Sequence, residues 1–324
     1  MSIASSSAVG PPPGMAVRLS SNEAPFGPSP AAVEAVRGLA DDLHLYPDDQ
    51  SVALRDALAE RLGRTRDEVA LGTGSAALLM DLIAHECHAG GDVLTYERAF
   101  IVYRLGARNV GAGYVEAPTG GPATLEDEGY ARDVDALLER IDGDTRLVIV
   151  DNPGNPTGAH LTGEQLTALV AGVPEHVTVA VDEAYNEFAV GQQGFATIGE
   201  LGLEHPRLLV LRTFSKAYAL AGLRVGYVTG PAELVASLDA WRTRFNVNAA
   251  AQAAALAALE DSEHLRRTVE GTLEGRARMA AALRELGVPF TDGLGNFLTL
   301  ELGTPAAPIV EAYARHGVGV RPLA

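Results

Sequence analysis

Short apolar runs alternate with stretches of helical spacing from about residue 67 to residue 213. The apolar runs are rich in valine and leucine and lie at 92–96, 146–151, 177–182 and 207–213. Continuous runs of this kind are typical of strands buried on both faces of a parallel sheet. The stretches with helical spacing lie at 76–88, 101–108 and 161–173. This alternation predicts an α/β fold in which helices cover a mostly parallel sheet.

The pattern changes near residue 231. Consecutive helical stretches follow, and after them come a strand-like run at 296–302, a helix near 309–316 and a last strand-like run at 318–323. Such a mixture indicates an α+β segment. We expect an N-terminal arm at 1–40 that packs with the small domain, a large domain at 41–235, and a small domain at 236–324.

Composition and charge narrow the classes of partner. The chain has 324 residues, of which 47% are apolar, and this is enough for a large core. The formal net charge of −17 repels phosphate backbones and anionic lipids, so we expect neither nucleic acid nor membrane as a partner. The single cysteine, Cys87, forms no intrachain disulfide, and no secretory signal is visible. We expect a soluble cytoplasmic protein.

The motif GTGSAA at 72–77 lies between a short strand and a helix. It satisfies the dinucleotide-binding pattern of glycines, which alone is a weak signal. The backbone amides of Ser75 and Ala76 open the helix and suit an anion. A plain strand-to-helix turn is the alternative.

Two further motifs follow strands. DNPGNPTG at 151–158 predicts a sharply turned loop from which Asn155 projects an amide; the alternative is a turn stabilised by its own side chains. In VAVDEAYNEF at 179–188, Asp182 stands at the end of an apolar strand, with Tyr185 three residues later. A carboxylate there needs a positive partner unless it serves as a helix N-cap.

The motif LRTFSKAYALAGLRVGY at 211–227 carries the strongest chemical signal. Lys216 follows a buried strand and stands among small and hydroxyl residues. A lysine in apolar surroundings has a lowered pKa and serves as an amine nucleophile. Arg224, eight residues later, is suited to a phosphate, whereas a solvated surface lysine fits poorly with the flanking apolar strands.

Taken in order, these motifs resemble those of fold-type I pyridoxal-phosphate aminotransferases, in the family of the histidinol-phosphate aminotransferases. The resemblance covers nearly the whole chain. It also includes LSSNEAPFGPSP (19–30), LYPD (45–48), ERAFIVY (97–103), RFNVN (244–248), NFLTLEL (296–302) and GVGVRP (317–322). It implies a transaminase that binds pyridoxal 5′-phosphate, an amino substrate and a 2-oxo acid, and that works as a homodimer.

The resemblance also implies roles for single residues. Lys216 would bind the cofactor as a Schiff base and then move the substrate's proton. Asp182 would pair with the protonated pyridine nitrogen, so that the ring acts as an electron sink. Tyr185 and Asn155 would bind the phenolic oxygen of the ring, and Phe100 would stack on its face.

For the cofactor's phosphate the resemblance implies Ser75, Ala76, Ser215 and Arg224. Tyr46 would reach the phosphate in the neighbouring subunit. Arg321 would bind the distal phosphate of the substrate; an ion pair between the domains is the alternative. Asn22 belongs to the substrate entrance. No metal site is expected, because the adjacent residues 85–88 do not converge on a helix.

Four departures from the family pattern are visible. Relatives frequently have Asn-Glu-Asn where this chain has Asn22-Glu23-Ala24, and an acidic pair where it has Ala76-Ala77. Gly154 replaces a frequent asparagine, and we expect little consequence from it. In relatives a second arginine follows the Val-Arg-Pro motif and clamps the substrate's α-carboxylate, whereas no arginine follows Arg321 here. We therefore expect an incomplete C-terminal end and slow conversion of glutamate.

The first interpretation is an aminotransferase that converts histidinol phosphate and 2-oxoglutarate to imidazole-acetol phosphate and glutamate. Alternatives are an aromatic amino acid aminotransferase, a lyase such as threonine-phosphate decarboxylase, and a catalytically incomplete homologue that binds the cofactor. A nicotinamide-dependent oxidoreductase would use GTGSAA but would leave Lys216, Asp182 and Asn155 unexplained.

Overall fold

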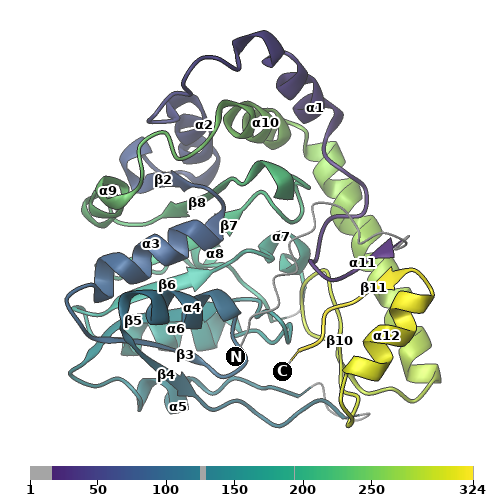
Figure 1. Ribbon diagram of the computed structural model, residues 1–324. Coiled ribbons are helices and arrows are strands. Elements are labelled where there is room, and N and C mark those ends of the chain that lie inside the picture. Colours follow the sequence, from purple (N-terminus) through teal and green to yellow (C-terminus); the bar gives the residue numbers. More distant parts are fainter. Residues whose placement is uncertain (1–16, 125–128, 193, 324) are drawn as a thin grey trace.

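A seven-stranded sheet forms the centre of the computed structural model, which describes residues 17–124, 129–192 and 194–323 (Figure 1). The strand order is β2-β8-β7-β6-β5-β3-β4. The strands are β2 (Val69–Gly72), β3 (Asp92–Tyr96), β4 (Gly113–Ala117), β5 (Thr145–Asp151), β6 (Thr178–Asp182), β7 (Leu208–Thr213) and β8 (Gly226–Thr229). β8 pairs antiparallel with β2 and β7, whereas the pairs β7–β6, β6–β5, β5–β3 and β3–β4 are parallel. The expected α/β fold with a mostly parallel sheet is confirmed.

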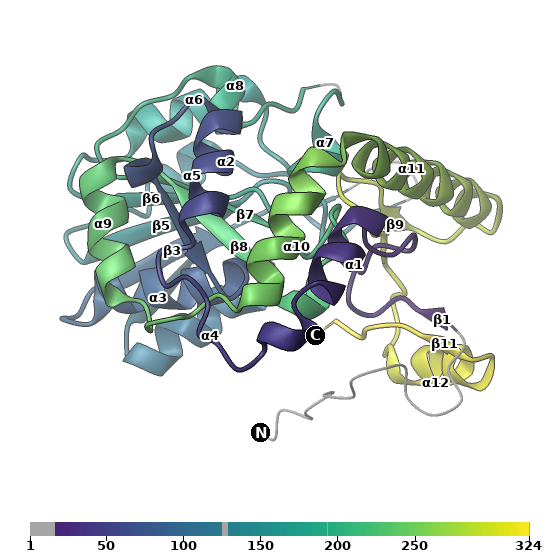
Figure 2. The same ribbon diagram turned by 90° about the horizontal axis from the view of Figure 1, so that it is seen from above.

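Helices cover both faces of this sheet, as Figures 1 and 2 show. One face is covered by α3 (Ser75–Cys87), α4 (Ile101–Val110) and α9 (Ala232–Trp241). The other is covered by α5 (Val134–Leu138), α6 (Gly163–Gly172) and α8 (Ile198–Leu201). Successive strand residues point to opposite faces, so Ile149 packs in the first layer while Val148 and Val150 pack in the second. Burial on both faces explains why the strands appear as continuous apolar runs.

A third apolar cluster lies at the β2 end of the sheet. It brings together α1 (Pro30–Arg37), α2 (Val52–Leu62) and α10 (Ala249–Glu260), with Leu71 of β2 and Tyr227 of β8. The alanine-rich α10 thus packs with helices from the first part of the chain. Three 3-10 turns connect these elements: η1 (Ala40–Asp42), η2 (Arg66–Glu68) and η3 (Ala221–Leu223).

The two ends of the described chain meet in the smaller part of the molecule. This part holds α11 (Ser262–Glu285), β9 (Phe290–Thr291), β10 (Thr299–Leu300), α12 (Ala307–Arg315) and β11 (Val318–Gly319). The first strand, β1 (Val17–Arg18), pairs in parallel with β11, so the two lie side by side in Figure 2. The short helix α7 (Asn186–Ala189) follows β6. The domain boundaries at residues 40 and 235 stay predictions.

Candidate active site

Most of the candidate site residues from the sequence analysis lie at one edge of the sheet. The parallel strands β2, β5, β6 and β7 all end at this edge. The antiparallel strand β8 begins there, and its Gly226 pairs with both Gly72 of β2 and Thr213 of β7. Arg224, which precedes β8, is therefore placed beside Ser75 and Ser215, which follow the other two strands. Ligands bind at such edges of open α/β sheets.

Lys216 lies in the turn after β7 and is half-buried. Its Nζ donates hydrogen bonds to the carbonyl oxygens of Ser21, at 3.0 Å, and Asn22, at 3.4 Å. Burial lowers the pKa of Lys216 to about 8; the Glu23 carboxylate opposes this shift, whereas Arg321 and Arg224 add to it. The amine is therefore close to its neutral, nucleophilic form at moderately alkaline pH. Lys216 is also the only lysine in the sequence.

Tyr185 stands next to this amine, with its ring centroid 5.4 Å from Lys216 Nζ. Its hydroxyl oxygen accepts hydrogen bonds from Asn155 Nδ2, at 3.0 Å, and Asn22 Nδ2, at 3.1 Å. Burial raises the pKa of Tyr185 well above its usual value, so the hydroxyl keeps its proton. Because two amides already fill its acceptor positions, the O–H remains able to donate to an oxygen placed beside it.

Asp182 ends β6 and is only 3% exposed. Its Oδ2 accepts from the Tyr103 hydroxyl at 2.9 Å, and its Oδ1 from the Ala184 amide at 3.1 Å. The pKa of Asp182 is raised to about 7, mainly by burial and then by the neighbouring Asp151; the bonds from Tyr103 and Ala184 oppose the shift. A cation against this carboxylate would bring its pKa back down.

Phe100 caps the start of α4 and is half-buried. Its ring meets that of Tyr103 edge to face, with centroids 5.9 Å apart. Tyr103 in turn binds Asp182. The aromatic side chain expected to stack on a ring is thus connected to the carboxylate expected to bind that ring.

An anion cradle, which we define as Ser75, Ala76, Ser215 and Arg224, is built at the start of α3. Arg224 Nη1 donates to Ser215 Oγ at 3.2 Å. A Cβ at Gly74 would lie 2.5 Å from Arg224 Nη2, and a Cβ at Gly226 would lie 2.5 Å from the Ser75 amide nitrogen. Gly74 also has a φ of +83°, which disfavours other residues. The two glycines therefore let an arginine and a helix N-terminus approach closely enough to share one anion.

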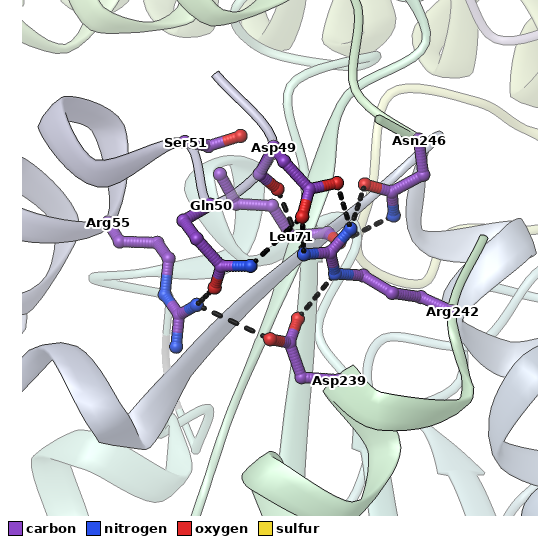
Figure 3. Close-up of a pocket in the computed structure, with 8 residues that line it drawn as sticks. All are labelled: Asp49, Gln50, Ser51, Arg55, Leu71, Asp239, Arg242 and Asn246. Carbon is purple, nitrogen blue, oxygen red and sulfur yellow. Dashed lines mark hydrogen bonds and ion pairs between the residues drawn. The ribbon is translucent and has the colours of Figure 1, made fainter. Parts of the chain in front are cut away.

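Tyr46 lies outside this arrangement. It is 82% exposed, and its ring stacks on Phe245 with centroids 4.7 Å apart. Asp49, three residues later, anchors the segment: its carboxylate accepts from Arg242 Nη1 at 3.2 Å, as Figure 3 shows. It also accepts from the Phe245 amide at 2.6 Å. These bonds lower the pKa of Asp49 to about 2.

Arg321 follows β11 and is exposed. Its charge nevertheless acts on the site, since it lowers the pKa of both Lys216 and Tyr185. β1–β11 pairing brings this end of the chain toward Asn22, whose side chain binds Tyr185. The structure therefore brings Asn22 and Arg321 to the Lys216 region and leaves Tyr46 facing outward.

Two residues at this site had not been singled out from the sequence. Tyr103 binds Asp182, and its spacing of three residues from Phe100 on a helix was the available signal. Asn296 donates from Nδ2 to the carbonyl oxygen of Asn22 at 3.0 Å. It begins the strand-like run 296–302, but an asparagine there carries no signal without the tertiary contact.

Within the described ranges, no group of three His, Cys, Asp or Glu side chains is arranged to hold a metal ion. The residues at 85–88 serve the packing instead: Glu86 forms an ion pair with Arg207 at 2.7 Å. None of the helices in the described part of the chain is long and apolar enough to cross a membrane.

Comparison with known proteins gives consistent matches. The sequence matches the family model described as aminotransferase class I and II over residues 15–323. It is 44% identical to histidinol-phosphate aminotransferase 2 of Methylococcus capsulatus, over 95% of this chain and 82% of that protein. It is 40% identical to the histidinol-phosphate aminotransferase of Akkermansia muciniphila, over 94% of this chain and 81% of that protein.

Solved structures of aminotransferases have a similar fold. The fold is similar to histidinol-phosphate aminotransferase from Sinorhizobium meliloti in complex with pyridoxal-5′-phosphate, with a TM-score of 0.87 and 29% identity over 96% of this chain and 83% of that chain. It is also similar to aspartate aminotransferase from Thermus thermophilus with maleate, with a TM-score of 0.81 and 26% identity over 94% of this chain and 83% of that chain.

Proposed function

The chain belongs to the aminotransferase class I and II family, and from this premise we propose that it is a pyridoxal 5′-phosphate-dependent histidinol-phosphate aminotransferase. The reaction would convert histidinol phosphate and 2-oxoglutarate to imidazole-acetol phosphate and glutamate. One observation carries the proposal: the only lysine of the sequence lies, with its pKa lowered to about 8, at the edge of the sheet that also holds Asp182, Tyr185 and the anion cradle. A nicotinamide-dependent oxidoreductase would not need Lys216, Asp182 and Tyr185 at this edge, so that interpretation of GTGSAA is without support.

The residues present fit this cofactor. The anion cradle has the donors that a phosphate requires, and its glycines leave the space that a side chain would fill. Asp182 would bind the pyridine nitrogen, Tyr185 and Asn155 the phenolic oxygen, and Lys216 the aldehyde carbon. Phe100 would lie against the ring face. When bound, the protonated ring accepts the electron pair released as the substrate's Cα–H bond breaks.

Asp182 is suited to hold a proton on a ring nitrogen. Burial raises the pKa of Asp182, and its hydrogen-bond donors in the described part of the chain, Tyr103 and the Ala184 amide, carry no positive charge. A protonated nitrogen supplies that charge, and the pair is buried, where charge-assisted hydrogen bonds are strong. Tyr103 and the Ala184 amide keep the carboxylate in place.

Lys216 is suited to take the proton from the substrate's Cα and to deliver it to the carbon that would come from the cofactor's aldehyde. A pKa of about 8 lets the amine accept a proton and release it again near neutral pH. The carbonyl oxygens of Ser21 and Asn22 orient the amine toward Tyr185.

Arg321 would bind the distal phosphate of histidinol phosphate, because an exposed guanidinium near Lys216 offers a planar fork to a phosphate. Asn22, bound to Tyr185, would line the entrance for the same substrate. Both residues lie on segments joined by β1–β11 pairing.

We also propose a cytoplasmic homodimer in which the active sites are shared. Leu43, Leu45 and Tyr46 are 78%, 58% and 82% exposed, and such a run of apolar side chains favours a protein partner. A second copy of the chain would cover them, and Tyr46 would then reach the cradle of its neighbour. The buried single cysteine is compatible with a reducing compartment.

The decisive experiment combines spectroscopy with a substrate panel. Protein mixed with pyridoxal 5′-phosphate should gain a visible absorbance band, and borohydride should fix the cofactor on Lys216. Amino transfer from histidinol phosphate to 2-oxoglutarate should exceed transfer from aromatic amino acids. Absence of the band, or fixation at the chain's N-terminal amine, would overturn the cofactor assignment. Faster transfer from an aromatic amino acid, or decarboxylation of threonine phosphate, would replace the substrate assignment.

A further inference from the structure

A buried ion pair behind the site has no role in the function proposed above. Arg132 Nη2 lies 2.5 Å from Asp151 Oδ1, and the two side chains are only 2% and 4% exposed. Arg132 Nη1 also donates to the carbonyl oxygen of Asp151. The guanidinium lies 5.1 Å from the ring centroid of Tyr96. Burying such charges away from water is costly, so the loss of either partner would strongly destabilise the folded protein.

The second oxygen of Asp151 is directed toward the cofactor-binding residues. Oδ2 accepts from the backbone amide of Asn155 at 2.9 Å and from the backbone amide of Phe100 at 3.3 Å. One carboxylate thus holds the backbone of the residue expected at the phenolic oxygen and of the residue expected on the ring face.

Asp151 is also the direct neighbour of Asp182. The two residues are register partners at the ends of the parallel strands β5 and β6. The charge of Asp151 raises the pKa of Asp182, and the charge of Arg132 lowers the pKa of Asp151 against the effect of burial. Several other titratable groups interact electrostatically with Arg132, Asp151 or Asp182: Tyr96 of β3, Tyr103 of α4, Tyr114 of β4, His160, Glu183, Tyr185 and Lys216.

Arg132 lies so close to Gly154 that a side chain at this position would collide with it. A Cβ at Gly154 would overlap Arg132 Nη2, and it would lie 3.0 Å from Cζ and 3.2 Å from the carbonyl oxygen of Ala159. The glycine expected to be of little consequence is therefore the position that gives Arg132 its space. The bond from the Gly154 amide to the Ala159 oxygen, at 2.8 Å, keeps this loop closed around the guanidinium.

We propose that Arg132 and Asp151 are a positioning pair for the bound cofactor. Arg132 holds the Asp151 carboxylate in place, so that its other oxygen fixes the backbones of Asn155 and Phe100. At the same time the positive charge of Arg132 offsets part of the negative charge beside Asp182. Neither residue contacts reacting atoms. This inference rests on the proposed cofactor.

The test uses Arg132→Met, Arg132→Lys and the double variant Arg132→Met/Asp151→Asn. Two properties are measured: the dissociation constant of pyridoxal 5′-phosphate, and the midpoint pH at which the visible band of the bound cofactor titrates. Arg207→Met is the matched control, because Arg207 pairs with Glu86 at the opposite edge of the sheet. Unfolding midpoints of the cofactor-free proteins show which variants are folded.

Arg132→Met should weaken cofactor binding about tenfold or more, the range of a lost hydrogen bond to a charged group. It should also raise the midpoint pH, because the uncancelled charge of Asp151 favours the protonated cofactor. Arg132→Lys should keep the midpoint and lose affinity, because the charge remains while the two-pronged contact is lost. The double variant should return the midpoint to the wild-type value, since both charges are gone.

The inference is overturned if Arg132→Met and Arg207→Met change both properties equally, or if the double variant titrates like Arg132→Met. Arg132→Lys and the double variant decide the matter if Arg132→Met does not fold. The two proposals fail separately. Wild-type protein that binds no cofactor overturns the proposed function, whereas wild-type protein labelled on Lys216 with unchanged Arg132 variants overturns only the positioning pair.

Discussion

The ring pocket and the entrance of this site are built differently. The ring pocket, comprising Asp182, Tyr185, Asn155 and Lys216, lies at the ends of the central strands. In it Asn155 donates to the Tyr185 hydroxyl, and Asp182 accepts from Tyr103 and from the Ala184 amide. The entrance, comprising Asn22, Arg321 and Tyr46, lies on segments near the ends of the chain and on an outward-facing loop. Arg321 and Tyr46 are exposed, whereas Asp182 and Tyr185 are buried.

This difference separates two aspects of function. Groups fixed by buried strands set the chemistry, since their positions follow from the packing of the sheet. Groups on exposed segments set which substrate is accepted, because such segments vary without disturbing the core. Changes in the ring pocket should therefore affect all substrates alike, whereas changes in the entrance should distinguish between them.

The largest effect is expected for Lys216→Ala. Loss of the amine removes the group that moves the proton, so amino transfer should fall at least 10²–10⁴-fold, about the range for a general acid or base. Histidinol phosphate and glutamate should be affected equally, as measured by single-turnover rates. The anion cradle should still bind the cofactor without fixing it. A variant that keeps one of the two half-reactions would contradict the division into ring pocket and entrance.

Asp182→Asn should have the next largest effect. A neutral amide no longer stabilises a proton on the ring nitrogen, so both half-reactions should slow by about 10²–10³-fold, the range for a preorganised electrostatic contact. The measurement is kcat for each half-reaction. Tyr103→Phe, which removes only one bond to this carboxylate, should slow both far less. Wild-type rates for Asp182→Asn would exclude the pairing with the ring nitrogen.

Arg321→Ala should separate the substrates. It removes a charged partner of the phosphate, and the KM for histidinol phosphate should rise about 10–100-fold, as for a lost charged hydrogen bond. The KM for glutamate should change much less. Arg315→Ala, on the last turn of α12, is the control for a general effect of removing an arginine from this segment. Equal changes for both substrates would mean that Arg321 has a structural role.

The smallest effect concerns the anchor of the Tyr46 loop. The pKa of Asp49 is lowered to about 2, so its contribution to folding stability is present above about pH 4 and is lost as the pH falls toward 2. Asp49→Asn lacks this contribution at every pH. The difference in urea midpoint between wild type and Asp49→Asn should therefore shrink from pH 7 to pH 3. A constant difference over this range would show that the Arg242 contact is not ionic.

The sequence predicted the centre of the fold well. The predicted runs at 92–96, 177–182 and 207–213 agree with β3, β6 and β7 within a residue at each end, because strands buried on both faces need continuous apolar residues. The short strands β4 and β8 were not indicated. β4 is only partly buried, and β8 has four residues and begins with a glycine. Of the run at 296–302, only Thr299–Leu300 forms a strand.

The site, too, contains residues that the sequence pattern indicates and residues that it does not. Lys216, Asp182 and Asn155 stand in motifs with unusual residues at strand ends, so their positions could be predicted, while their roles stay predictions. Arg132 lies in an irregular segment that is joined to Thr119 by a single bridge. No periodicity or motif points to such a residue, because its importance comes from a contact across the fold. Asn296 could not be predicted either, because its contact with Asn22 also joins distant parts of the chain.

The position of the antiparallel strand β8 in the sequence affects when the cofactor site can form during synthesis. The anion cradle requires β2, β7 and β8 side by side, yet β2 is synthesised early and its only neighbour in the sheet, β8, comes much later. Pairings so distant along the chain form late, because a long loop must first close. We therefore expect the nascent polypeptide to capture cofactor only after residue 229 has left the ribosome. A vitamin supplement during expression would then stabilise completed chains and leave shorter ones without benefit.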